Sequence, residues 1–191
     1  MKKSKRSKKS NTWKIKQHRD QFFKKSKTLG YRSRASFKLI ELNKKFKFIK
    51  ANSNLLDLGS SPGGWSQVAS QIITKGKIMS IDIKDMESVK NVKFIKRNLL
   101  EDKVQDEVKK YFESNLDIIL SDMAADTTGN KSLDSIRTNQ LCAQVINFSK
   151  KTLKPKGVLV SKLFMGEDFI EVKNLAKSLF KKVNFYKPES S

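Results

Sequence analysis

Apolar residues in this chain gather in short runs, which alternate with longer segments where apolar positions recur every three or four residues. The short runs cover residues 55–58, 77–82, 92–96, 116–121 and 157–164. Runs of this length, bounded by glycine, asparagine or charged residues, are typical of strands buried in a sheet. Residues 183–186 are expected to begin one more strand.

The longer segments predict helices. Ser33 is placed to cap a helix that continues to about Lys45, and a further helix contains Trp65, Val68 and Ala69 at the spacing of one buried face. Gly76 is expected to end that second helix. Other helices are predicted at residues 101–114, 133–153 and 168–180.

Strands that alternate with helices favour an α/β fold with a doubly wound, mainly parallel sheet. The chain shows no internal repeat, and its 191 residues suit one domain with a full hydrophobic core. We therefore expect a single domain over residues 29–191, preceded by a basic, partly disordered tail over residues 1–28.

The fold is organised around residues 54–73, where a buried strand leads through a turn of small residues into a helix. Nucleotide-like ligands bind at such turns in open α/β folds, at the carboxyl ends of the strands. The spacing of Gly59, Gly63 and Gly64 fits neither the dinucleotide fingerprint nor the phosphate loop, in which Trp65 would replace the lysine. A turn that serves packing alone is the alternative.

The positive charge is concentrated at one end of the chain. Of a net charge of +22, residues 1–50 hold 19 Lys and Arg against two acids, whereas residues 51–191 hold 22 against 17. A concentrated basic segment favours a polyanion such as nucleic acid as the partner. Lysines that only solubilise the chain need no such clustering, and membrane binding would need an apolar helix face that residues 1–12 lack.

The remaining composition narrows the class of protein. With one cysteine, Cys142, and one histidine, His18, we expect neither an intramolecular disulfide nor a zinc site. No apolar run approaches the length of a membrane span, so we expect a cytoplasmic protein without a membrane partner. Aromatic and basic residues interleave over residues 13–25, as either an RNA-contacting surface or a short docked helix.

Charged residues close three of the predicted strands. Asp82, Asp122 and Lys162 should face one crevice, because the carboxyl ends of parallel strands meet at one edge of a sheet. Asp82 is placed to bind ribose hydroxyls, or else is an ordinary turn former. Asp57, inside the first strand, is expected to hold the loop backbone. Lysine is rarely buried unpaired, so Lys162 is either functional or an edge-strand lysine.

The segment DLGSSPGGWSQ, residues 57–67, resembles the S-adenosylmethionine loop of the FtsJ family of ribose 2′-O-methyltransferases. Other segments resemble the family's signatures in the same order and at the same spacing, and they cover residues 33–39, 121–124, 160–164 and 187–191. The resemblance runs from about Gly30 to Ser191. It implies a Rossmann-like, S-adenosylmethionine-dependent methyltransferase fold.

The resemblance also implies a catalytic set of Lys38, Asp122 and Lys162, with Lys162 as the base that takes the 2′-hydroxyl proton. A lysine acts as a base only when neutral, and its ordinary pKa lies near 10.4. Burial and the nearby cation Lys38 would lower the pKa of Lys162. Asp122 opposes that shift, but it can orient the ammonium group and favour the cationic methyl donor.

The resemblance further implies where ligands bind. Arg32, Arg34 and the N-terminal lysines would hold RNA phosphates, and no metal is implied. Asn98 stands where the family usually carries an acid near the adenine, so we expect weakened cofactor binding. The residues implied to line the S-adenosylmethionine site are Gly63, Trp65, Asp82, Asn98 and Asp122.

One departure concerns the C-terminal part of the family pattern. The family continues beyond K-P-[DE]-S-S into a segment with a catalytic glutamate and a final strand, whereas this chain stops at Ser191. Glu189 matches the acid of that motif and is not the catalytic glutamate. Either the sequence is a fragment of a longer chain, or the enzyme lacks this glutamate and strand, which would leave a gap or an open edge in the sheet.

Together these features predict an enzyme that methylates the 2′-oxygen of a ribose, in a uridine of large-subunit ribosomal RNA. We expect a monomer that acts on the assembled large ribosomal subunit, with S-adenosylmethionine as cofactor. The alternative is a catalytically weakened RNA-binding ribosome-assembly factor, because the catalytic glutamate is missing. A small-molecule methyltransferase is disfavoured by the basic N-terminal quarter.

Overall fold

A computed structural model of the chain describes residues 21–191, and the predictions for residues 1–20 lie outside this range. Two helices, α2 (Gln21–Thr28) and α3 (Ala35–Phe46), precede the sheet. The strands are β1 (Leu55–Leu58), β2 (Ile78–Asp82), β3 (Val92–Lys96), β4 (Leu116–Ser121) and β5 (Leu153–Ser161). The remaining helices are α4 (Gly64–Ile72), α5 (Asp102–Phe112), α6 (Lys131–Thr152) and α7 (Phe169–Leu179).

The five strands form one sheet in the order β3-β2-β1-β4-β5, and every neighbouring pair is parallel. Leu55 of β1 pairs with Ile78 on one side and with Ile118 on the other. The strand order therefore reverses at β1, which opens a crevice at the carboxyl ends of β1 and β4. The predicted doubly wound α/β fold is confirmed.

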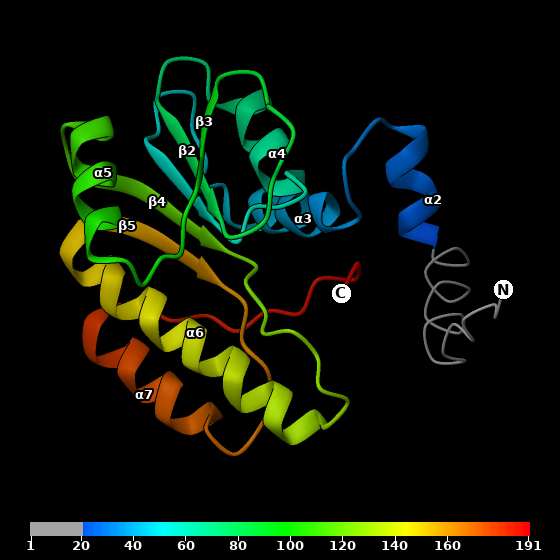
Figure 1. Cartoon of the computed structure of the whole chain (residues 1–191), viewed down its shortest axis with the longest axis vertical. Coiled ribbons are helices and arrows are strands. Elements are labelled where there is room, and N and C mark those ends of the chain that lie inside the picture. The colour runs from blue at the N-terminus through cyan, green and yellow to red at the C-terminus, as the bar shows by residue number, and fades with distance from the viewer. Residues whose placement is uncertain (1–20) are drawn as a thin grey trace, which may run out of the picture.

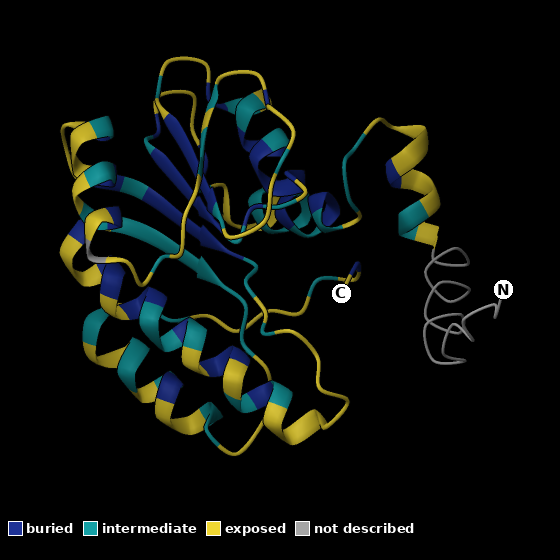
Figure 2. Cartoon of the chain, viewed as in Figure 1, coloured by how far each residue is buried: buried dark blue, intermediate teal, exposed yellow. Residues whose placement is uncertain are grey.

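Alternate residues of the central strands face opposite layers of helices. Leu55 and Ile118 pack with α3 and α4, whereas Leu56 and Ile119 pack with α5 and α6. The period of two in a strand thus explains why these runs are apolar without interruption: both faces are covered. In Figure 2, β1 and β2 are accordingly buried, and the edge strand β5 is only half-buried.

Helix α7 belongs to a smaller third cluster on the outside of α6. The cluster is centred on Cys142 and Ile146 of α6 and on Val172 of α7. Within residues 21–191, no helix is both long enough and apolar enough to cross a membrane.

The last predicted strand does not form. Residues 183–186 make no strand pairing, and within the described residues β5 pairs only with β4. The segment crosses instead to α3, where the Tyr186 hydroxyl donates to Glu41 and the Tyr186 ring lies 6.0 Å from that of Phe46. Side-chain contacts with a helix, and not pairing with a strand, therefore hold this segment.

Strand β5 was predicted at residues 157–164 and spans Leu153–Ser161, so it begins four residues earlier and ends three residues earlier than predicted. Pro155 and Gly157 indicated a break, but an edge strand tolerates proline because one side of its backbone pairs with nothing. The strand accommodates them through an irregularity in its register with β4 and a left-handed Lys156. Lys162 therefore follows the last strand residue instead of lying inside the strand.

Ser33 and Gly76 were predicted to begin and to end helices, but they have other roles in the structure. Ser33 does not cap α3: the N-cap residue is Arg34, which makes no side-chain capping bond, and the Ser33 carbonyl accepts the Ser36 N–H at 3.2 Å. Gly76 does not end α4 in a left-handed conformation. It is required because a Cβ there would overlap the Ser53 carbonyl, against which the chain packs.

The N-terminal part of the described chain is helical. Helix α2 lies within the predicted tail of residues 1–28 and packs on α3, with the Phe22 and Phe37 rings 5.6 Å apart and Ser26 buried. For residues 21–28 the structure thus favours a docked helix. The other residues considered for an RNA-contacting surface there, including Trp13 and His18, lie outside the described range.

Candidate active site

The glycine turn (residues 59–64) joins β1 to α4 at the carboxyl edge of the sheet. Gly59 and Gly63 have φ values of 71° and 105°, in the left-handed region that favours glycine. A Cβ on Gly59 would also overlap the Met123 side chain. The Gly59 N–H donates to the Ile81 carbonyl at 2.8 Å, which ties the turn to β2.

A hollow of about 70 Å³ lies at this turn. Two hydroxyl oxygens at the hollow, those of Ser33 and Ser60, are buried and have no hydrogen-bond partner within residues 21–191. Buried polar groups are nearly always paired, so unpaired hydroxyls beside a hollow indicate a place for a polar ligand. Besides several residues of the glycine turn, the lining comprises Ser33, Ala35, Asp57, Trp65 and Asp122.

Trp65 is at once part of the core and part of the wall of this hollow. It is buried between α3 and α4, and its indole N–H donates to the Ala35 carbonyl at 2.7 Å. Gly63 is the N-cap residue of α4 and positions the first turn of that helix. Trp65 therefore lines the hollow, whereas Gly63 does not, and the cofactor contact of both residues stays a prediction.

Asp82 and Asn98 do not line the hollow. The Asp82 carboxylate accepts backbone N–H groups from Ser61 and Lys84, both at 2.8 Å, and so fastens the end of β2 to the glycine turn. The Asn98 amide oxygen accepts the Leu100 N–H at 3.1 Å. Their contact with a cofactor stays a prediction, since each acceptor oxygen keeps a second lone pair.

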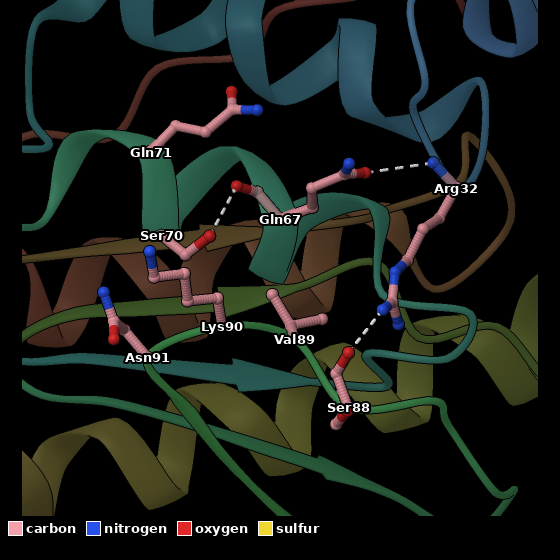
Figure 3. A pocket seen from close by; sticks show the side chains of 8 residues that line it. All are labelled: Arg32, Gln67, Ser70, Gln71, Ser88, Val89, Lys90 and Asn91. Carbon is pink, nitrogen blue, oxygen red and sulfur yellow. Dashed lines mark hydrogen bonds between the residues drawn. The ribbon is translucent and has the colours of Figure 1, made fainter.

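Arg32 joins two loops. Its guanidinium donates to the carbonyls of Glu87 at 2.6 Å and Ser88 at 2.5 Å, and more weakly to Pro62 of the glycine turn. Figure 3 shows it at one end of a hollow of about 310 Å³ beside α4, where the Gln67 side chain accepts the Arg32 backbone N–H. The Arg32 and Gln67 side chains already have hydrogen-bond partners within the protein. We therefore interpret this larger hollow as a junction between structural elements and not as a ligand site.

The two arginines expected to contact RNA therefore differ. The guanidinium of Arg32 is engaged with backbone carbonyls, and its RNA contact stays a prediction. Arg34 is exposed at the start of α3, and its positive charge acts on the pKa of Lys162. The RNA contact of Arg34 likewise stays a prediction.

Asp57 is buried beneath the glycine turn. Its carboxylate accepts the Ser66 hydroxyl at 2.6 Å, and Ser66 is also 2.6 Å from the Ser80 hydroxyl. It thereby holds the first turn of α4 to the sheet and not, as expected, the loop backbone. Burial raises the pKa of Asp57 to about 7, although the Ser66 hydrogen bond partly offsets this.

This shift predicts how stability depends on pH. An unfolded chain releases the Asp57 proton near 3.8 and the folded chain near 7, so the folded chain holds an extra proton between these values. The free energy of unfolding should therefore fall as the pH rises through that window, by on the order of 4 kcal/mol, and level off above it.

Urea unfolding of wild type and Asp57→Asn at pH 5 and pH 8 tests this, because other titrating groups are common to both chains. The variant keeps an acceptor for Ser66 and does not titrate, so its stability relative to the wild type should rise between pH 5 and pH 8. An identical pH dependence in both chains would show that Asp57 does not titrate as described.

The lysine–aspartate cluster consists of Lys38, Asp122 and Lys162. The Lys38 ammonium lies 3.1 Å from one Asp122 carboxylate oxygen and 3.3 Å from the other, and the Lys162 nitrogen lies 3.8 Å from that second oxygen. All three side chains are about three-quarters or more buried. Lys38 comes from α3, Asp122 follows β4 and Lys162 follows β5, so the fold brings together all three residues predicted to be catalytic.

The surroundings of Lys162 favour its neutral form. Burial lowers its pKa first of all, and the positive charges of Lys38 and Arg34 lower it further, while Asp122 opposes them. The backbone N–H of Lys162 donates to the Ser121 carbonyl at 2.9 Å, and its ammonium lies 5.3 Å from the centre of the Phe164 ring. The amine is thus held in place and is nearer to neutrality than an exposed lysine.

Two polar residues at the site were missed by the sequence analysis. Thr138 and Asn139 of α6 are fully buried, and both contact loops that follow the sheet. The available signal was their spacing, since they precede Cys142 by four and three residues and share its buried face. Polar residues on an apolar helix face need partners, and here those partners are the loops.

A doubly wound parallel sheet with this glycine turn, and with two lysines and an aspartate at its carboxyl edge, defines a Rossmann-like methyltransferase. Residues 31–191 match the model of the FtsJ-like methyltransferase family. The chain belongs to this family, which confirms the resemblance seen in its motifs.

Relatives cover nearly the whole chain. A ribosomal RNA large subunit methyltransferase E of Pelagibacter ubique is 43% identical over 95% of this chain and 90% of its own length. One of Rickettsia akari is 40% identical over 98% of this chain and 85% of its own length. The crystal structure of a ribosomal RNA methyltransferase from Plasmodium falciparum is 34% identical, with a TM-score of 0.76 over 84% of this chain and 93% of that one.

S-adenosylmethionine is the cofactor of this family, and the residues at the glycine turn fit it. The Ser33 and Ser60 hydroxyls, which have no partner within residues 21–191, offer hydrogen bonds to a polar ligand. Asp122 also lines this hollow, where the negative charge of its carboxylate favours a ligand that carries positive charge.

Proposed function

We propose that this enzyme methylates the 2′-hydroxyl of a ribose in large-subunit ribosomal RNA. The observation that carries the proposal is the lysine–aspartate cluster beside the glycine turn. The two relatives of about 40% identity, both named ribosomal RNA large subunit methyltransferase E, support the RNA substrate. The target is a uridine in the assembled subunit, and the enzyme acts as a cytoplasmic monomer without a metal.

In the proposed mechanism, the neutral amine of Lys162 accepts the proton of the 2′-hydroxyl. Asp122 orients that amine and stabilises the ammonium that results, and Lys38 holds Asp122 through both carboxylate oxygens. When bound, S-adenosylmethionine supplies an electrophilic methyl group whose departure leaves a neutral thioether. The methyl group would take the place of the proton on the ribose oxygen, and Lys162 would then release that proton to solvent.

RNA is held by the basic N-terminal quarter. Helix α2 carries exposed lysines and Arg34 is exposed at the start of α3, the helix that supplies Lys38, whereas the exposed Lys44 and Lys45 lie in the last turn of α3. Phosphate contacts position a nucleic acid without reading its sequence. The shape of the ribosomal particle around the target therefore determines which nucleotide is methylated.

Transfer of tritium from labelled S-adenosylmethionine to large ribosomal subunits tests the proposal, with subunits from a strain that lacks the modification. After nuclease digestion, the label should appear in 2′-O-methyluridine. Subunits that are already methylated serve as the control and should take up no label. Label on a base or on a protein would contradict the proposed reaction.

A further inference from the structure

Consecutive residues of α6 hold the two loops that carry Asp122 and Lys162. The first of these is Thr138, which is 1% exposed. Its hydroxyl oxygen accepts the backbone N–H of Ala125 at 3.2 Å. Ala125 lies three residues after Asp122, so this bond fixes the path of the loop that follows β4.

The second residue, Asn139, is fully buried and makes three hydrogen bonds. Its amide oxygen accepts the Phe164 N–H at 2.8 Å, and its amide nitrogen donates to the Phe164 carbonyl at 3.0 Å and to the Asp168 carboxylate at 2.8 Å. The side chain thus pairs with both backbone groups of Phe164, as a neighbouring strand would. Phe164 lies two residues after Lys162.

The contacts with α6 begin just beyond the point where backbone pairing between β4 and β5 ends. The last backbone bond between the two segments is the one from Lys162 to Ser121. Beyond it the loops leave the sheet toward the N-terminal half of α6 (Figure 1). Arg137 adds a bond to the Asp126 carbonyl at 3.2 Å, and Gly166 packs so closely on Ser135 that a Cβ would overlap its hydroxyl.

We propose that Thr138 and Asn139 are positioning residues for methyl transfer. By holding both loops on one turn of α6, they set the separation between the Asp122 carboxylate and the Lys162 amine, which is 3.8 Å here. Neither side chain is proposed to contact the substrate or the cofactor. The inference rests on the proposed role of Lys162 as the base.

The variants Thr138→Val and Asn139→Leu test this, because each keeps the approximate volume of the side chain and removes its hydrogen bonds. Misplacement of a catalytic group by about 1 Å costs roughly 10²-fold in rate, so we expect kcat to fall by about tenfold for Thr138→Val and about a hundredfold for Asn139→Leu. The dissociation constant for S-adenosylmethionine, measured by calorimetry, should change by less than about threefold, since neither residue lines the glycine turn.

A pH profile of kcat separates positioning from loss of fold. A Lys162 released from its loop becomes more hydrated, which raises its pKa, so the rising limb of the profile should move to higher pH in both variants. Thr152→Val is the matched control, because Thr152 is also buried in α6 but, within residues 21–191, its hydroxyl bonds only to the Phe148 carbonyl of its own helix. It should keep the wild-type kcat and profile, as should Thr138→Ser, which retains the hydroxyl.

The inference is overturned if Thr138→Val and Asn139→Leu match Thr152→Val in kcat and pH profile. It is equally overturned if both lose activity only through unfolding, with no shift of the profile in the folded fraction. A Lys162→Met enzyme that keeps its rate would instead overturn the proposed base. The two failures are therefore distinguishable.

Discussion

Replacement of Lys162 by methionine is expected to lower kcat by about 10²- to 10⁴-fold, the range that a general base contributes. Methionine keeps most of the length of the side chain but cannot accept the 2′-hydroxyl proton. Lys162 does not line the hollow at the glycine turn, so the dissociation constant for S-adenosylmethionine should change by less than about threefold. Single-turnover tritium transfer and calorimetry measure the two quantities separately.

Lys154→Met is the matched control for this variant. Lys154 lies in β5, the strand that Lys162 follows. Like Lys162, it lies near an aspartate, and its ammonium is 2.8 Å from the Asp117 carboxylate. It belongs to the opposite end of β5, so its loss should leave kcat unchanged. A Lys162→Met enzyme with more than about a tenth of the wild-type kcat would remove Lys162 from the mechanism.

The same pair of variants addresses the alternative of a ribosome-assembly factor. Such a protein would bind S-adenosylmethionine and RNA without turnover, so wild type and Lys162→Met would be equally inactive. They would also bind ribosomal particles equally well. Measurable turnover by the wild type that is lost in Lys162→Met excludes the alternative.

Deletion of residues 1–20 is expected to lower the affinity for large ribosomal subunits by about 10²-fold or more at low salt. The segment contains nine Lys and Arg against one Asp. Each phosphate contact that is lost also flattens the dependence of log K on log salt, by about 0.7 to 0.9 per contact. At saturating subunit concentration kcat should be retained, because the lysine–aspartate cluster lies outside the deleted segment.

A full-length variant with the nine basic residues changed to glutamine is the control, since it removes charge and keeps chain length. It should reproduce both the lower affinity and the flatter salt dependence. If the deletion changes affinity and the glutamine variant does not, the contact is not electrostatic. A deletion that changes neither would favour a small-molecule acceptor over RNA.

The central part of the fold could be predicted from the sequence because burial on both faces leaves a clear signal. The strands at residues 55–58, 92–96 and 116–121 agree with the structure at both ends. The errors lie at the edge of the sheet, where Pro155 and Gly157 are tolerated, and at residues 183–186, whose partner is a helix. An apolar pattern shows that a segment is extended or buried, but it does not show what the segment packs against.

That Lys38, Asp122 and Lys162 lie together was predictable, because each stands in a motif with few alternatives. The contacts around them were not. Whether Arg32 holds RNA or backbone carbonyls depends on where the loop after β2 passes, and the position of Ser33 beside the glycine turn depends on the docking of α3. Both are consequences of tertiary packing and leave no trace in local spacing.

Lys38 and its two partners approach from opposite sides of the sheet, since α3 lies on one face while α6 secures the other two segments on the other. No contiguous fragment of the chain that lacks one of these layers therefore contains an assembled lysine–aspartate cluster. Under the proposed mechanism, a chain still being synthesised on the ribosome stays inactive until β5 and Lys162 have emerged.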